Sequence, residues 1–246
     1  LDANVRGVGA DKAMGGRRFS NYTWHGDQAP GHPFVHGLQA SDVDFADLRY
    51  SKLVIQVGKN LIENKMPEAH WLTEVIERGG KLVVITPEYS PSATKADYWI
   101  PCRTGISDTT IFLTMTKIII DNKWYDEDFV KKFTDFPLLV RTDTLKRLQP
   151  HEIIKDYKQP ELDYSHTVQG LKKEQRKQLG DFVVYDSKTK DFMAITREDV
   201  GKKMVAKGID PSLEGTFKVE TVDGKTVEVM TLFDLYKIHL RDFDVK

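Results

Sequence analysis

An aspartate set among histidines is the first feature of this sequence that could do chemistry. Asp27 lies between His25 and His32, and His36 follows a few residues later. A single carboxylate oxygen suits an oxophilic metal centre, whereas Asp27 together with the histidines suits zinc or non-haem iron. A structural explanation is equally available, in which the histidines hydrogen-bond the loop and Asp27 caps it. The pattern alone leaves these alternatives open.

The residues around Asp27 predict a stiff, ordered loop. Residues 1–50 show little regular periodicity, but their aromatic side chains favour packing over disorder. Glycine permits strained backbone and proline restricts the backbone, and the segment alternates the two. These residues are Gly26, Pro30, Gly31 and Pro33, and the aromatic ones are Phe19, Tyr22, Trp24 and Phe34. We therefore expect residues 1–50 to form a long ordered loop region, which would be a metal-ligand region if Asp27 binds a metal.

Polar residues also follow three predicted strands, in the segments 58–60, 86–90 and 104–108. In an open α/β sheet, ligands bind beyond the carboxyl ends of the strands, where loop amides and helix N-termini converge. Glycine lets a phosphate or a ring approach the backbone closely, and an acid such as Glu88 can bind ribose hydroxyls. Together the three segments predict a nucleotide site.

Each of these residues has a simpler explanation when it is taken alone. Gly58 could only turn the chain, Glu88 could be a solvated loop acid, and Asp108 could do no more than start a helix. The sequence has no G-x-G-x-x-G signature, which disfavours an ordinary NAD site. Cys102 is assigned no role, because a lone buried cysteine is usually inert.

Alternating strands and helices would position these segments. Residues 52–57 and 81–86 are apolar, largely β-branched runs typical of buried parallel strands, and a shorter strand is expected at 98–100. A helix is expected from Pro67 until Gly79-Gly80, and another begins at Ser107 with its apolar face buried. A further short helix is expected from Asp126 to Phe133. The arrangement predicts a doubly wound, mostly parallel α/β lobe over residues 51–150.

The last part of the chain differs. Residues 182–185 and 192–196 predict one β-hairpin, and residues 217–222 and 226–230 predict a second around Asp223-Gly224. Residues 141–180 are expected to form a connecting segment over the surface, and residues 231–242 an amphipathic helix. The third predicted region, residues 151–246, therefore contains a connecting segment, hairpins and a terminal helix.

Composition excludes several classes of function. The formal net charge is −1, which gives no electrostatic bias toward nucleic acid or an anionic membrane. Apolar runs are far shorter than the roughly 20 residues of a membrane span. The single cysteine, Cys102, cannot by itself build an iron–sulfur cluster. The sequence starts with Leu1 and has no leader pattern, so we expect an internal piece of a longer polypeptide, and the compartment stays open.

Several segments, in the same order, resemble a known family. The sequence reads Gly15 to Phe19, Tyr22 to Pro33, Gly58 to Asn60, Val84 to Tyr89, Ala96 to Pro101, Gly105 to Asp108 and Phe133 to Val140. These runs are similar to molybdopterin oxidoreductases of the dimethyl sulfoxide reductase family, in the branch of nitrate reductase α subunits and nitrite oxidoreductase. The resemblance covers about residues 7–147 well and the hairpins loosely. Relatives commonly have Asp-Leu-Pro-Pro where this chain has Asp-Gln-Ala-Pro from Asp27, and Asp-Pro-Arg where it has Thr86-Pro87-Glu88.

The resemblance implies roles for particular residues. Asp27 matches the aspartate that ligates molybdenum, with Trp24 and His25 shaping the pocket and His25 or His32 relaying protons. Gly58 and Asn60 would line the pterin and pyrophosphate of one molybdopterin guanine dinucleotide. Thr86 and Glu88 would bind its guanosine, and Gly105 and Asp108 its guanine end. The family usually has two such cofactors and a [4Fe-4S] cluster, and the second cofactor site and the cluster are expected in missing parts of the subunit.

The implied activity is two-electron oxygen-atom transfer, most simply the interconversion of nitrite and nitrate. The implied partners are a small oxyanion substrate and an iron–sulfur electron-transfer subunit. The resemblance also allows a haem subunit, and nucleic acid is not expected as a partner. Two other classes stay open: a non-catalytic α/β module that binds a nucleotide or docks on a partner, and a zinc or iron hydrolase built on the histidine-rich loop.

Overall fold

The computed structural model describes residues 44–105, 107–162 and 173–243. The chain forms two compact units that divide between Thr104 and Gly105. The predicted loop region with its histidines and Asp27 lies outside the described residues, apart from its last few positions. The predicted domain boundaries at residues 50 and 150 stay predictions.

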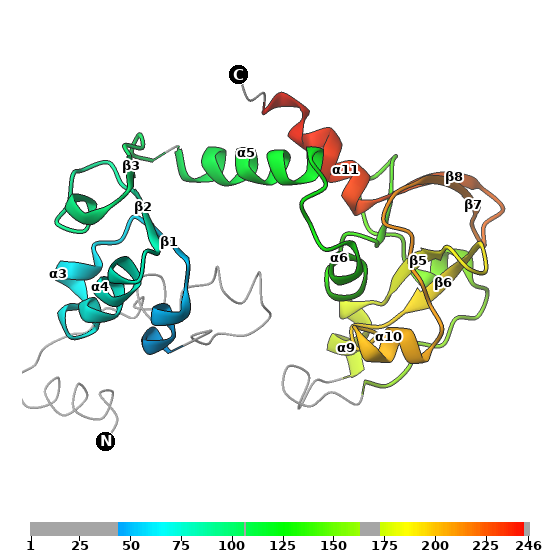
Figure 1. Ribbon diagram of the computed structural model, residues 1–246. Helices are drawn as coiled ribbons and strands as arrows, with labels where there is room; N and C mark the ends of the chain where they lie inside the picture. The colour runs from blue at the N-terminus through cyan, green and yellow to red at the C-terminus, as the bar shows by residue number, and fades with distance from the viewer. Residues whose placement is uncertain (1–43, 106, 163–172, 244–246) are drawn as a thin grey trace, which may run out of the picture. The chain divides into compact units, whose positions relative to one another are not determined.

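The first unit is built on a three-stranded parallel sheet in the order β1-β2-β3 (Figure 1, blue to green). The strands are β1 (Leu53–Val57), β2 (Lys81–Ile85) and β3 (Tyr98–Ile100), as the sequence predicted. The helical elements between and before them are η2 (Phe45–Tyr50), α3 (Leu61–Asn64), η3 (Met66–Glu68), α4 (Ala69–Glu77) and η4 (Ala93–Lys95).

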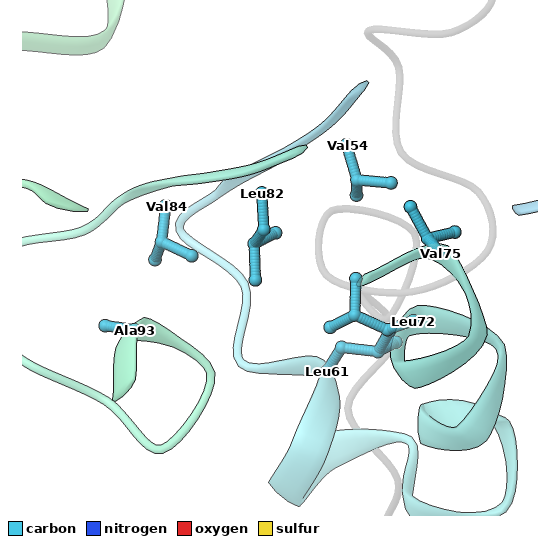
Figure 2. Packing of buried hydrophobic residues seen from close by; sticks show 7 residues of the cluster. All are labelled: Val54, Leu61, Leu72, Val75, Leu82, Val84 and Ala93. Atoms are coloured by element: carbon cyan, nitrogen blue, oxygen red, sulfur yellow. The ribbon is translucent and has the colours of Figure 1, made fainter. Parts of the chain in front are cut away.

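One face of this sheet packs against the helices. Figure 2 shows strand side chains such as Val54 and Leu82 reaching toward Leu61 of α3 and Leu72 of α4, and all four are buried. The opposite face of β1 carries Leu53, which is 52% exposed, and Ile55, which is 42% exposed. The prediction that β1 is buried throughout is therefore wrong, because the described helices of the first unit pack against the other face of the sheet.

The end of α4 follows the predicted glycine pair. Gly79 has φ +81°, a left-handed conformation that costs glycine little, and its amide bonds the carbonyl of Ile76. A Cβ on Gly80 would lie 2.8 Å from the carbonyl oxygen of Val75, so only glycine lets the chain turn this closely into β2. Gly79-Gly80 thus ends the helix, as expected.

The second unit combines helices with two antiparallel sheets. Its strands form the orders β4-β8-β7 and β5-β6. The strands are β4 (Leu139–Arg141), β5 (Phe182–Asp186), β6 (Asp191–Ile195), β7 (Thr216–Glu220) and β8 (Thr226–Thr231). The helices are α5 (Ser107–Asp121), α6 (Glu127–Phe133), α7 (Pro150–Ile153), α9 (Lys173–Leu179), α10 (Lys202–Ala206), α11 (Leu232–His239) and η5 (Leu240–Asp242). Both predicted hairpins and the mixed α/β class are confirmed.

Two expectations about burial in this unit are wrong. In α5 the buried residue is Ile120, which packs with Phe233 and Leu240, while Phe112 and Met115 farther along the apolar face remain exposed. Within the second unit, Leu113 and Ile120 of α5 pack in the cluster that contains Phe233 of α11 and Leu240 of η5. The connecting segment does not simply cross the surface either, because Leu148 is fully buried.

Candidate cofactor-binding site

The candidate site lies at the carboxyl edge of the parallel sheet in the first unit. Four residues predicted to bind cofactor lie in the two loops at this edge: Gly58, Asn60, Thr86 and Glu88. The Gly58 amide donates to the carbonyl of Ile85 at 3.0 Å, so the ends of β1 and β2 are held together. The structure thus brings these four residues to one edge.

Gly58 leaves the backbone open. Its φ is +59°, in the left-handed region that favours glycine, and among the described residues no atom other than those of its chain neighbours lies within 4 Å of where a Cβ would stand. The backbone conformation therefore explains why this residue is a glycine. The open space beside it would let a ligand approach the backbone.

Asn60 is joined to the neighbouring loop by its side chain. Its Oδ1 accepts a hydrogen bond from the Ser92 hydroxyl at 2.9 Å, and its Nδ2 donates to Glu63. The same Ser92 hydroxyl accepts the Ile62 amide at 3.3 Å. Because both polar atoms of Asn60 have partners in the protein, its contribution to a ligand would come from its backbone and its remaining hydrogen-bonding capacity.

Thr86 is directed into the protein. It is buried, and its hydroxyl donates to the carbonyl of Glu88 at 2.6 Å. The indole Nε1 of Trp99 lies 3.3 Å from both the hydroxyl and the carbonyl oxygen of Thr86. Thr86 therefore shapes the loop after β2, and Glu88 is the charged residue among the exposed ones that this loop presents.

Sequence reasoning missed the buried polar side chains beneath this edge. Gln56, Ser90 and Ser92 are buried. Gln56 Oε1 accepts the Leu61 amide at 3.5 Å, but Gln56 Nε2 and Ser90 Oγ have no hydrogen-bond partner in the part of the chain that the structure describes. A buried polar atom without a partner costs free energy, so these two groups mark places where a ligand or an ordered water would be accommodated. Gln56 could have been noticed as the one polar residue inside an apolar strand.

The last two predicted residues belong to the second unit. Gly105 has φ +85° and open space around its Cβ position, and Asp108 is exposed in the first turn of α5. Gly105 thus leaves the backbone accessible, and Asp108 lies at the start of a helix, as the sequence predicted.

The predicted metal and pocket residues Asp27, His25 and Trp24, together with His32, lie outside the described residues. Among residues 44–105, 107–162 and 173–243 no three His, Cys, Asp or Glu side chains come together in a way that could hold a metal ion. None of the helices in those ranges is long and apolar enough to cross a membrane. The assignment of Asp27 as a metal ligand stays a prediction.

The fold and the site together place the chain among α/β proteins that bind a ligand at the carboxyl edge of a parallel sheet. In such proteins a glycine without close neighbours and polar loops at this edge are typical of sites for nucleotides. The family model of molybdopterin oxidoreductase matches residues 11–225, so the chain belongs to the molybdopterin oxidoreductase family. Membership implies a molybdenum–molybdopterin cofactor. The described strand ends fit part of such a ligand: the space at Gly58, the unpartnered Gln56 and Ser90 atoms, and the exposed Glu88 offer polar contacts.

Individual relatives are α subunits of reductases. The perchlorate reductase α subunit of Dechloromonas aromatica is 32% identical over 90% of this chain and 25% of its own length. The respiratory nitrate reductase α subunit of Haloferax mediterranei is 30% identical over 94% of the chain and 22% of its own length. Respiratory nitrate reductase 1 α chain of Escherichia coli is 34% identical over 52% of the chain and 11% of its own length. The chain spans about a quarter or less of the length of these relatives.

Proposed function

We propose that this chain is part of the catalytic subunit of a molybdenum oxidoreductase and holds one of two molybdopterin guanine dinucleotides. The observation that carries the proposal is the carboxyl edge of the parallel sheet, where Gly58, Asn60 and Glu88 lie in adjoining loops. Family membership supports a pterin, and the strand-end geometry supports a ligand extended by a nucleotide.

Each residue of this edge has a role in the proposal. The backbone at Gly58 admits the pyrophosphate, and the exposed Glu88 carboxylate accepts hydrogen bonds from ribose hydroxyls. Asn60 contributes to the pterin side, and Thr86 supports the loop. On the family resemblance alone, Gly105 and Asp108 are assigned to the guanine end. Asp27 is assigned as the protein ligand of molybdenum, with Trp24 and His25 shaping the substrate pocket.

The proposed reaction is two-electron oxygen-atom transfer between nitrite and nitrate. Nitrite gains one oxygen atom from water, and two protons and two electrons leave; the reverse reaction consumes them. When bound, the molybdenum centre supplies the redox change of two electrons and an exchangeable coordination position. His25 or His32 would move protons near neutral pH. The [4Fe-4S] cluster expected elsewhere in the subunit would supply the exit for the electrons toward an iron–sulfur partner subunit, with a haem subunit as a third component.

Metal and nucleotide analysis of the full-length protein tests the cofactor. We expect molybdenum, and about two guanine nucleotides released per molybdenum after acid hydrolysis, since the family usually holds two cofactors. A metal-free protein that binds only a simple nucleotide would support the alternative, a non-catalytic α/β nucleotide-binding or partner-docking module. Zinc or iron in place of molybdenum would support a hydrolase.

Substitution of the proposed ligand tests its role in turnover. Asp27→Ala in the full-length protein should abolish nitrite oxidation and nitrate reduction while molybdenum and guanine nucleotide remain bound, because the pterins still hold the metal. Asp44→Ala is the control, since Asp44 is an exposed acid whose carboxylate caps the short helix η2 at the Ala46 amide. Turnover of Asp27→Ala at the wild-type rate would remove the ligand assignment.

A further inference from the structure

Two arginines of the second unit are held on the same aromatic ring. The guanidinium carbon of Arg147 lies 4.8 Å from the ring centroid of Phe182, and that of Arg197 lies 5.4 Å from it. Phe182 is buried at the start of β5 and is 8% exposed. Cation–π attraction therefore gathers two positive charges at one place.

The carboxylate of Asp181, which acts electrostatically on Arg197, already has partners. The side chain of Asp181 is fully buried, and it binds Arg176 at 2.8 Å and the hydroxyl of Tyr157 at 2.9 Å. Burial, together with the bond to Asp181, raises the pKa of Tyr157 to about 12, so its hydroxyl stays a donor. In the described ranges of the chain, no Asp or Glu oxygen lies within 4.0 Å of the guanidinium of Arg147 or Arg197.

The positive charges repel one another at this place. Burial, followed by the charges of Arg147 and Arg176, lowers the pKa of Arg197, and Asp181 offsets this only in part. Arg197 is thus influenced by two neighbouring guanidiniums and by the carboxylate of Asp181. An anion bound between them would be favoured by all three charges.

The guanidiniums of Arg147 and Arg197 are held in position before any ligand arrives. An Arg197 Nη donates to the carbonyl of Leu179 at the end of α9, at 3.3 Å, which uses one of its five N–H groups. Arg147 pairs with Val140 of β4 in a β-bridge, and the next residue, Leu148, is fully buried. Little side-chain ordering would remain to be done on binding, which favours affinity.

We propose that Arg147 and Arg197, held on Phe182, form a binding site for an oxygen anion. Guanidinium groups bind carboxylate and phosphate oxygens through paired N–H groups, so the ligand is a carboxylate or a phosphate-like oxyanion. The same chemistry has two sources: a free anion in solution, or an acidic side chain of a partner protein that inserts between the arginines.

A titration with inorganic phosphate tests the site in the full-length protein, at constant ionic strength maintained with chloride. The melting temperature should rise along a saturable curve in the wild type, because a ligand that binds the folded state stabilises it. Arg147→Gln combined with Arg197→Gln should weaken the apparent affinity by about tenfold or more, through loss of charge-assisted hydrogen bonds. Lys188→Gln with Lys190→Gln is the matched control, because it removes the same charge from the exposed turn between β5 and β6 and should leave the curve unchanged.

The source of the anion is distinguished by repeating the titration on the complex with partner subunits. Saturable binding to both forms identifies a free anion, and binding only to the separated subunit identifies a partner carboxylate that occupies the site in the complex. An equal response of the wild type and the double arginine variant, or no response of the wild type in either form, would overturn the proposal.

Discussion

Ser92 is fully buried, and its hydroxyl joins the two loops at the carboxyl edge of the parallel sheet. It donates to Asn60 Oδ1 at 2.9 Å and accepts the Ile62 amide at 3.3 Å. A hydroxyl with both a donor and an acceptor role is difficult to replace. Ser92 therefore fixes the loop in which Gly58 and Asn60 are proposed to meet the cofactor.

Ser92→Ala should lower the free energy of unfolding by about 1–3 kcal/mol, because it leaves buried polar groups without partners. It should also speed loss of cofactor from the full-length protein, as measured by guanine nucleotide retained after gel filtration. Ser51→Ala is a serine-to-alanine control at the end of η2, away from the two loops. Equal stability and retention of the two variants would contradict the role given to Ser92.

Asp186, at the end of β5, is a buried carboxylate whose ionised form is bound by the protein. It accepts hydrogen bonds from the amide and hydroxyl of Thr189, at 3.0 and 2.7 Å, and from the Asp210 amide at 2.8 Å. Burial by itself would raise the pKa of Asp186, but these hydrogen bonds outweigh it and lower the pKa below the usual value of 3.8. The folded state therefore favours the carboxylate.

The sign of the pH dependence follows from this lowered pKa. The ionised carboxylate stabilises the fold above the unfolded-state pKa, near pH 4, and the contribution is lost as the pH falls through the folded-state pKa. Asp186→Asn should cost about 1–3 kcal/mol in the free energy of unfolding at pH 7. We expect urea denaturation between pH 7 and pH 3 to show that the difference in free energy of unfolding between Asp186→Asn and the wild type becomes smaller below about pH 4.

Asp223→Asn is the control for this measurement, because Asp223 is exposed in the turn of the β7–β8 hairpin and an Asn-Gly pair suits that turn equally well. We expect it to match the wild type at every pH. A cost of Asp186→Asn that does not change with pH would show that the charge of Asp186 is unimportant.

At the scale of elements, the segment between β4 and α7 contributes to the core of the second unit. Leu148 is fully buried, and it packs in one cluster with Leu139 of β4, Val183 of β5 and Val229 of β8. Its amide bonds the carbonyl of Leu139 at 2.8 Å. This side chain thus joins the two antiparallel sheets.

Two leucines of this segment make a matched test. Leu148→Ala should lower the free energy of unfolding by about 2–5 kcal/mol, the cost of a cavity in a packed core. Leu145→Ala, at a position 66% exposed, should change it by less than about 0.5 kcal/mol. Equilibrium denaturation of both variants measures the difference, and similar values would mean that the segment is not part of the core.

At the scale of the whole molecule, the chain holds one cysteine and represents a quarter or less of the length of its relatives. Cys102 is half-buried, and its amide lies 3.4 Å from the carbonyl of Thr86. A [4Fe-4S] cluster is held by several thiolates, so one cysteine cannot supply its ligands. The cluster of the proposed enzyme therefore requires residues beyond this chain.

Cys102→Ser in the full-length protein should leave iron content, the electron paramagnetic resonance signal of the cluster and turnover unchanged. Loss of iron in this variant would mean that Cys102 is a cluster ligand after all. Because Cys102 follows β3 in the first unit, guanine nucleotide content should be measured alongside iron, so that an effect on the cofactor edge is recognised separately.

Local patterns in the sequence were sufficient for the longer strands, helices and hairpins, but strand β4 and the short helices α3, α7, α9 and α10 were not predicted. The apolar runs at 53–57 and 81–85 are strands, Gly79-Gly80 ends α4, and Asp223-Gly224 turns the second hairpin. Each signal depends on residues close together in the chain, because strand period, helix period and turn conformation are local properties. The family resemblance was equally readable, since its motifs are short and occur in a fixed order.

Tertiary structure alone decided which faces of the strands and helices are buried and which polar atoms are paired with each other. Ser92 meets Asn60 across 32 residues, and Phe182 collects Arg147 and Arg197 from separate segments. The same is true of the exposed face of β1 and the buried Leu148. Contacts between residues that are distant in the sequence cannot be predicted from periodic patterns, because they depend on how the elements pack rather than on neighbouring residues.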